Sequence, residues 1–246
     1  MMLMQKTKNY ILILILTLML TAFTSCLNQG LPTPLVHYSF SGNTVDGQGH
    51  SNRLENNGAK NTPDRFGAPD SAYYFDGISA SMMVNLSDMP DISTSLTISW
   101  WFKVEAGPVF KDSLDAGNMI ALVDTTKAIG IQFGYRAPGY KTKGLDIWNW
   151  GGGTILECQK PEIKQWHHCA YIYDGHKHQY FLDGQLVSES EVKPQSGRPN
   201  YLMLGNYPGG TQYFAGSLDE ILIYGQALSI DKITELFASR KALLPM

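Results

Sequence analysis

The sequence carries little charge, and its charge is not basic. Of its 246 residues 17% are charged, and 19 lysines and arginines stand against 22 aspartates and glutamates. A protein that binds the phosphate backbone of nucleic acids needs a basic face, so this composition excludes nucleic acid as a partner. The hydrophobic content of 43% is enough for a buried core, which excludes intrinsic disorder as the main state.

Long apolar runs are also missing, with one exception near the N-terminus. Residues 11–20 form an apolar run that follows Lys6 and Lys8. This run is shorter than the roughly 20 residues that cross a bilayer, so it predicts an export signal peptide over residues 1–25 rather than a membrane span.

The signal peptide ends at a cysteine, and Ser25-Cys26 resembles the lipobox of bacterial lipoproteins. That resemblance implies a diacylated Cys26 as the mature N-terminus, with residues 26–34 as a lipidated tether. It also implies a lipid-anchored protein of the bacterial outer membrane, on either its periplasmic or its surface side. An ordinary signal peptide with an incidental cysteine is the alternative.

Cysteine is scarce, with two residues beyond Cys26. Export would place Cys158 and Cys169 in an oxidising compartment. If residues 155–158 and 166–173 form a hairpin, the two cysteines face each other and a disulfide is geometrically possible. The alternative is a pair of buried free thiols.

Short β-rich segments separated by turns make up most of the chain, which has 24 glycines and 12 prolines. In residues 96–104 strict alternation predicts a strand whose core face carries Leu96, Ile98, Trp100, Phe102 and Val104. Further strands are expected at residues 35–40, 73–77, 119–123, 129–135, 145–148, 166–173, 179–182, 186–187, 201–204 and 217–224. Near the C-terminus, Ser229 is expected to cap a short helix in which Ile230, Ile233, Leu236 and Phe237 share one face.

These elements predict an all-β fold, a two-sheet antiparallel jelly-roll sandwich with a short C-terminal helix. No linker interrupts the strands, so residues 35–246 are expected to form one domain.

Five groups of segments, in order, resemble the laminin-G-like, concanavalin A-like jelly-roll domains. They are residues 35–40, residues 64–67 with 71–77, residues 96–102, residues 166–175 with 180–184, and residues 204–205 with 214–224 and 227–229. The resemblance covers residues 35–238 and implies the same jelly-roll fold. Such domains include lectins, glycosidases and adhesive modules, so function has to be argued from a site.

Catalysis is not expected. Glycosidases of this fold carry a Glu-x-Asp-x-x-Glu run on one strand, and the sequence has neither this run nor a Gly-x-Ser-x-Gly nucleophile elbow. Asp219 and Glu220 are adjacent, so alternation predicts that they point to opposite faces. Asp112 and Asp115 lie in a turn-like segment.

A structural calcium ion is implied by the resemblance. In the family, the loop after the first strand and the acid of the closing strand commonly share the ion, and Asp46 and Asp219 occupy those positions, with Asn43 as a further ligand. The alternative is a turn in which Asp46 accepts hydrogen bonds from its own backbone. His167, His168, His176 and His178 are expected to be exposed hairpin residues rather than zinc ligands.

Carbohydrate binding is the leading functional prediction. Trp148 and Trp150 alternate, so they are expected on one face ahead of a glycine run, and Tyr140 precedes them. Residues 206–213, which include Tyr207, form a second loop rich in aromatic and amide side chains. The alternative is that the tryptophans belong to the core, where we place Trp100 and Trp166.

The sequence therefore predicts a non-catalytic, lectin-like lipoprotein of the cell envelope. Its partner would be a glycan or a cell-surface protein, and its contact with the membrane would be through the N-terminal lipid alone. A protein-binding or structural adhesion module of the same fold, without a sugar ligand, is the alternative.

Overall fold

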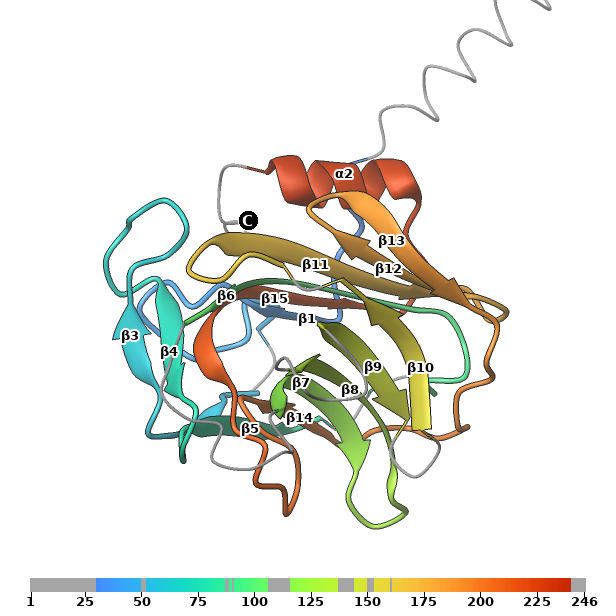
Figure 1. Cartoon of the computed structure of the whole chain (residues 1–246), viewed down its shortest axis with the longest axis horizontal. Coiled ribbons are helices and arrows are strands. Elements are labelled where there is room, and N and C mark those ends of the chain that lie inside the picture. The colour runs from blue at the N-terminus through green and yellow to red at the C-terminus, as the bar shows by residue number, and fades with distance from the viewer. Residues whose placement is uncertain are drawn as a thin grey trace, which may run out of the picture. The chain divides into compact units, whose positions relative to one another are not determined.

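The computed structural model describes residues 30–49, 52–86, 89, 91–105, 116–136, 144–149, 153–159 and 161–239. The chain divides into two compact units, Met1–Thr33 and Pro34–Met246, and the second contains the sandwich. Its described residues form two antiparallel sheets and one short helix, which confirms the predicted fold class (Figure 1).

The first sheet has eight strands in the order β13-β12-β11-β6-β15-β4-β3, and β1 pairs with β15 beside this path. Its strands are β1 (Val36–Tyr38), β3 (Lys60–Thr62), β4 (Ala72–Asp76), β6 (Leu96–Val104), β11 (Trp166–Tyr173), β12 (His178–Leu182), β13 (Gln185–Ser190) and β15 (Ala215–Tyr224).

The second sheet has seven strands in the order β10-β9-β8-β7-β14-β5-β2. Its strands are β2 (Glu55–Asn57), β5 (Ser81–Asn85), β7 (Ala116–Asp124), β8 (Ile129–Arg136), β9 (Leu145–Asn149), β10 (Gly153–Cys158) and β14 (Tyr201–Leu204). Sequence neighbours often belong to different sheets, as β5 and β6 do, so the chain crosses the sandwich repeatedly.

The core lies between the inner faces of the two sheets. Trp100 on β6 is fully buried, as predicted, and its ring centroid lies 5.1 Å from that of Phe133 on β8. Phe133 also contacts Tyr171 on β11, at 5.2 Å between centroids. Burial of each large side chain of this kind is worth about 1.5–3 kcal/mol, so these contacts across the sandwich hold the sheets together.

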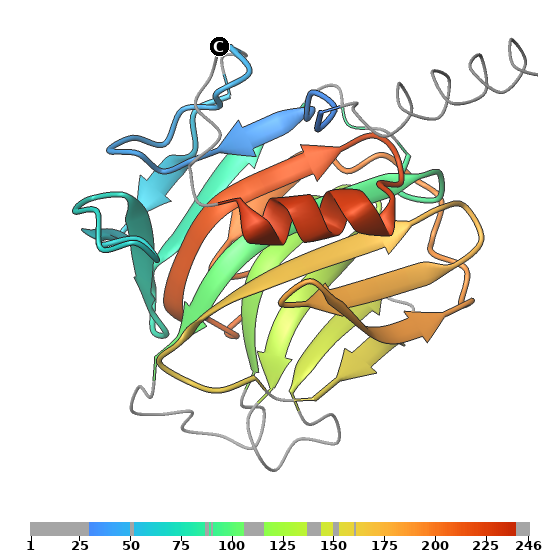
Figure 2. The ribbon, with the colours of Figure 1, turned by 90° about the horizontal axis from the view of Figure 1, so that it is seen from above.

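Helix α2 (Ile230–Ala238) covers the outer face of the eight-stranded sheet (Figure 2). Ile233 and Leu236 are buried, whereas Ile230 is exposed. Ser229 occupies the N-cap position with an extended backbone, but its side chain makes no capping hydrogen bond, contrary to our prediction. Within the described residues, no helix has the length and apolar character needed to span a membrane.

The hairpin of residues 155–158 and 166–173, which a disulfide would have required, does not form. Strand β10 pairs with β9 in the seven-stranded sheet, whereas β11 lies between β6 and β12 in the other sheet. The short strands β2, β3 and β5 were not predicted. Strand β2 is fully exposed and polar, so its sequence has no alternation of apolar and polar residues from which a strand could be predicted.

Candidate functional site

Three polar side chains meet on the outer face of the seven-stranded sheet, at one end of β8 and β9. In β8 and β9 the core residues are Ile131, Phe133, Tyr135, Leu145 and Ile147. Because side chains alternate along a strand, Arg136, Asp146 and Trp148 point to the opposite face.

Asp146 joins the other two residues of this group. Arg136 Nε and Trp148 Nε1 both donate hydrogen bonds to Asp146 Oδ2, at 2.6 and 2.8 Å. The side chains of Arg136 and Asp146 are 3% and 0% exposed, so each charge depends on the other for compensation. The Arg136 guanidinium lies 5.8 Å from the centroid of the half-buried Trp148 ring. Asp146 therefore fixes the orientation of both the indole and the guanidinium.

Gly134 makes room for this pair. It is the cross-strand neighbour of Asp146, and a Cβ atom at Gly134 would lie 2.7 Å from Asp146 Oδ1 and 3.1 Å from Arg136 Nη2. A side chain at this position would displace the ion pair.

The loop between β14 and β15 reaches the same site. Gln212 Oε1 accepts hydrogen bonds from Arg136 Nη1 at 3.2 Å and from Asn118 Nδ2 at 3.0 Å. Asn118 is 0% exposed, and its Oδ1 has no hydrogen-bond partner. The structure thus brings together the Trp148 segment and the loop of residues 206–213, which the sequence offered as two separate surfaces.

Of the predicted aromatic residues, Trp148 belongs to this group and Tyr207 lies in the adjoining loop, half-buried. A side chain at Gly210 would overlap the Tyr207 ring, so the loop holds that ring against its own backbone. Tyr140 and Trp150 lie outside the described residues. Trp166 is half-buried rather than a core residue, with Lys103 Nζ 5.6 Å from its ring centroid.

The comparisons with known proteins agree with this architecture. The sequence profile of the concanavalin A-like lectin/glucanases superfamily matches residues 69–234, more than half of the chain. The chain belongs to this superfamily. The resemblance that the sequence motifs indicated is thereby confirmed, while no curated protein matches the chain by sequence.

Several solved structures share the fold of this concanavalin A-like domain. Trypanosoma rangeli sialidase is 14% identical with a TM-score of 0.65, over 86% of this chain and 34% of that one. Domain 4 of AbnA, a GH43 extracellular arabinanase from Geobacillus stearothermophilus, in complex with arabinotriose, is 18% identical with a TM-score of 0.63, over 83% of this chain and 98% of that one. The botulinum neurotoxin serotype D/C binding domain is 11% identical with a TM-score of 0.60, over 83% and 51%. The chain thus spans about a third of the sialidase and about half of the neurotoxin domain's chain, and at these identities the likeness concerns the fold.

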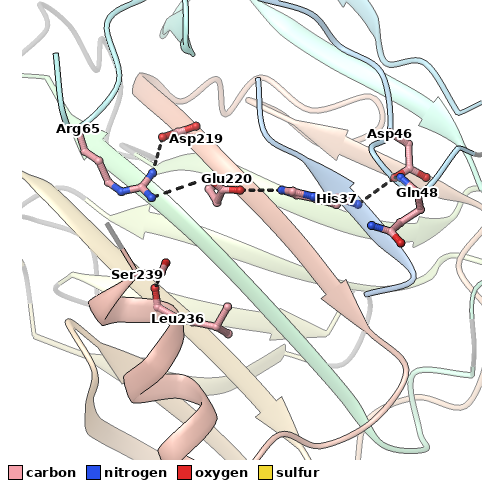
Figure 3. A network of polar contacts seen from close by, with 8 residues as sticks. All are labelled: His37, Asp46, Gln48, Arg65, Asp219, Glu220, Leu236 and Ser239. Atoms are coloured by element: carbon pink, nitrogen blue, oxygen red, sulfur yellow. Dashed lines mark hydrogen bonds and ion pairs between the residues drawn. The ribbon is translucent and has the colours of Figure 1, made fainter. Parts of the chain in front are cut away.

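A second polar network lies on the eight-stranded sheet of this concanavalin A-like domain (Figure 3). Arg65 Nη1 donates to Asp219 Oδ2 at 2.7 Å, and Arg65 Nη2 lies 3.7 Å from Glu220 Oε2. His37 Nε2 lies 2.6 Å from Glu220 Oε1, and the His37 backbone N–H donates to Asp46 Oδ1. These ion-paired side chains are at most 5% exposed.

The prediction that Asp219 and Glu220 point to opposite faces is wrong, because both reach Arg65. The pairing of β15 with β6 is irregular between Asp219 and Leu222, and Glu220 has a φ of 52°. This bulge breaks the alternation and turns two consecutive carboxylates toward one guanidinium.

The three predicted calcium ligands are not assembled into one site. Asp46 and Asp219 lie at opposite ends of the row of side chains in Figure 3, and Asp219 is paired with Arg65. The side chain of Asn43 bonds to Ser41 and Val45 in its own turn. No cluster of three or more His, Cys, Asp or Glu side chains suited to a metal occurs in the described parts of the chain. Calcium binding stays a prediction, which melting in calcium and in a chelator tests.

Three of the four histidines expected on exposed hairpins are buried instead. His167 bonds to Asp183 at 2.7 Å, His168 to Ser99 at 2.8 Å and His178 to Tyr171 at 2.7 Å. Burial, together with the nearby Arg65, lowers the pKa of His168 to about 3, so this ring is neutral. These histidines are hydrogen-bonded parts of the fold, and His176 is the exposed one.

Cys158 and Cys169 are free thiols on different sheets. Cys169 Sγ donates to Tyr180 Oη at 3.1 Å. Burial raises the pKa of Cys158 to about 12 and that of Cys169 well above its usual value, so both stay protonated. The structure thus has two free thiols and no disulfide, with Cys169 buried and Cys158 half-buried, and Cys26 lies outside the described residues.

Proposed function

We propose that this protein is a non-catalytic carbohydrate-binding protein, and that Trp148 and the side chains around it form its sugar site. The observation that carries the proposal is the state of Trp148. Its indole N–H is held by Asp146, so the ring has a fixed orientation while remaining only half-buried. A rigid aromatic face with a few polar groups beside it is the usual makeup of a site for a small polar ligand with apolar faces, such as a sugar ring.

Charge supports a neutral ligand. Arg136 and Asp146 compensate each other, and the other polar groups of the site are the amides of Asn118 and Gln212. Amides both donate and accept, as hydroxyl groups of a sugar require.

The carboxylates near the site support binding without hydrolysis. Asp146 accepts hydrogen bonds from Arg136 and Trp148 and is ion-paired with Arg136, and its cross-strand neighbour Glu157 is exposed. A glycosidase needs a pair of carboxyl groups, one of which keeps its proton in apolar surroundings. Neither acid has such surroundings.

Two structural neighbours also favour this proposal. One is an arabinanase domain in complex with arabinotriose, and another is a sialidase.

We further infer that a lipid at Cys26 anchors the domain to the bacterial outer membrane, because the apolar run of residues 11–20 is followed by a lipobox-like Ser25-Cys26.

A glycan array probed with the full chain tests the proposal. Trp148→Ala should abolish binding and leave the melting temperature nearly unchanged, since the ring is half-buried. Trp166→Ala is the matched control, because Trp166 is also half-buried but lies in the other sheet. Binding by the control and not by Trp148→Ala supports the site, and release of reducing ends from a bound glycan would contradict the non-catalytic role.

A protein-binding or adhesion module remains the alternative. It predicts that the array stays silent while Trp148→Ala leaves the protein's adhesion to cells unchanged.

A further inference from the structure

A continuous chain of hydrogen bonds joins the loop of residues 205–214, between β14 and β15, to the indole of Trp148. Gln212 Oε1 accepts a hydrogen bond from Arg136 Nη1 at 3.2 Å. Arg136 Nε in turn donates to Asp146 Oδ2 at 2.6 Å, and Trp148 Nε1 donates to the same oxygen at 2.8 Å. Gln212 comes from the loop, whereas the other three side chains come from β8 and β9.

The loop that carries Gln212 is fixed to β7 through its backbone. The Gly205 N–H donates to Met119 O at 2.9 Å, and the Asn118 N–H donates to Gln212 O at 3.0 Å. Both acceptors and donors here are main-chain groups, so they hold the loop whatever side chain stands at position 212. Gln212 is therefore placed beside Arg136 by the backbone of β7.

The orientation of the Gln212 amide follows from its two neighbours. A guanidinium carries hydrogen-bond donors only, so the oxygen of the amide, and not its nitrogen, has to face Arg136. The same oxygen accepts a hydrogen bond from Asn118 Nδ2 at 3.0 Å, and Asn118 is 0% exposed. Because a buried donor that loses its partner is costly, both neighbours hold this oxygen in place.

Gln212 and Asp146 hold different nitrogens of the same guanidinium. The Arg136 side chain is 3% exposed, with its Nη1 on Gln212 and its Nε on Asp146. Acceptors on two nitrogens fix the plane of this rigid group as well as its position. Since Asp146 Oδ2 also receives the indole N–H, a shift of the guanidinium would move the acceptor on which the orientation of Trp148 depends.

We propose that Gln212 is a positioning residue of the sugar site. Its Oε1 fixes Arg136 against Asp146, and through Asp146 it sets the orientation of the Trp148 ring. The loop of residues 205–214 and Trp148 are thereby coupled, so that a change in the loop alters binding at Trp148, and a ligand on Trp148 stabilises the loop in return. This inference rests on the proposed function and adds a residue that acts through Arg136 rather than on the ligand.

Nuclear magnetic resonance of the full chain with nitrogen-15-labelled tryptophan tests the positioning without a ligand. The chain has 5 tryptophans, and Trp148→Phe identifies the indole signal of Trp148. Gln212→Met keeps the side-chain length and removes the acceptor. Exchange of the Trp148 indole N–H with solvent should then be about tenfold faster, as expected for the loss of one hydrogen bond. Gln212→Glu keeps an oxygen acceptor at the same place and should restore the wild-type rate.

The same variants on the glycan array test the link to binding. On the glycan that the wild type binds, Gln212→Met should give a much weaker signal, and Gln212→Glu should give the wild-type signal. Gln179→Met is the matched control, since Gln179 lies on β12 in the other sheet and bonds to Glu189 at 2.9 Å. It should change neither readout. If Gln212→Met does not fold, Gln212→Asn replaces it, because its amide is one methylene group too short to reach Arg136.

Two results would overturn this inference and leave the proposed function standing. One is a wild-type exchange rate in Gln212→Met, or a rate in Gln212→Glu as fast as that of Gln212→Met. The other is faster exchange in Gln212→Met with unchanged binding. An array on which the wild type gives no signal would overturn the proposed function, and the exchange rates would still decide whether Gln212 positions Trp148.

Discussion

Asp219, in the network of Figure 3, is a buried acid whose pKa is unusually high. It is 2% exposed, and burial and the adjacent Glu220 raise its pKa to about 8, although Arg65 lowers it. An unfolded aspartate has a pKa of about 3.9. The folded chain therefore keeps a proton that the unfolded chain releases between about pH 4 and pH 8. Across that window the contribution of Asp219 to the free energy of unfolding falls as the pH rises, by at most about 1.4 kcal/mol per pH unit. The buried, neutral His168 contributes in the opposite direction below about pH 6.5, the pKa of an unfolded histidine.

Asp219→Asn should remove the contribution of Asp219, because the amide does not titrate, so the difference in unfolding free energy between the variant and the wild type should change with pH. Urea unfolding at several pH values between about 5 and 8 measures it. Asp76→Asn is the control: although partial burial acts against it, hydrogen bonds from Ser79, Ala80 and Ile78 lower the pKa of Asp76 to about 2. That variant should change stability by a constant amount over the same range. If the difference in unfolding free energy between Asp219→Asn and the wild type did not change with pH, the raised pKa of Asp219 would be contradicted.

Gly134→Ala tests the candidate site by adding one carbon atom beside the ion pair of Arg136 and Asp146. The added Cβ would meet the Asp146 carboxylate and the Arg136 guanidinium. We expect a loss of roughly 1–3 kcal/mol of stability from overpacking and a loss of glycan binding. Chemical unfolding and array binding measure the two effects. Gly30→Ala should change neither, since nothing lies within 4 Å of its Cβ position.

At the scale of elements, α2 is held to the eight-stranded sheet by a few apolar side chains. Ile233 is 0% exposed, so Ile233→Ala should cost about 2–5 kcal/mol in the free energy of unfolding. Ile230 on the same helix is 55% exposed, and Ile230→Ala should change stability by less than about 0.5 kcal/mol. Equal effects of the two variants would mean that the helix does not dock as described.

How well the sequence predicted an element depended on how much of the element is buried. Alternation located β6 and β14 from end to end, because one face of each strand packs in the core. The exposed β2 and the short β3 owe their conformation to their pairing partners, β5 and β4, which a sequence pattern does not reveal. In β15 the alternation rule failed at Glu220, where the bulge turns the chain.

Of the candidate site, the sequence predicted what a local pattern shows and missed the contacts between distant segments. Trp148 was found from its aromatic ring and its position in a strand, and alternation from Trp148 could have found Asp146 two residues earlier. The hydrogen bond between Asn118 and Gln212 joins residues far apart in the chain, so no local sequence pattern predicts it.

At the scale of the whole molecule, we expect a lipid on Cys26 to anchor the protein to the membrane. Mass spectrometry of protein extracted from membranes should show loss of residues 1–25 and a diacylglyceryl adduct on Cys26. Cys26→Ser should shift the protein to the soluble fraction. A wild-type protein that is soluble and begins at another residue would contradict the prediction.

The two ends of the sandwich, β1 and α2, lie in or on the sheet opposite to the one that carries the proposed sugar site. Strand β1 pairs with β15 in the eight-stranded sheet, and α2 lies on that sheet's outer face, whereas Trp148 is on the outer face of the other sheet. A dye, a biotin, a sensor surface or a fused partner can therefore be attached at either end without competing with a glycan. An array of such domains fixed by one end would present the proposed glycan sites to the medium in a common orientation.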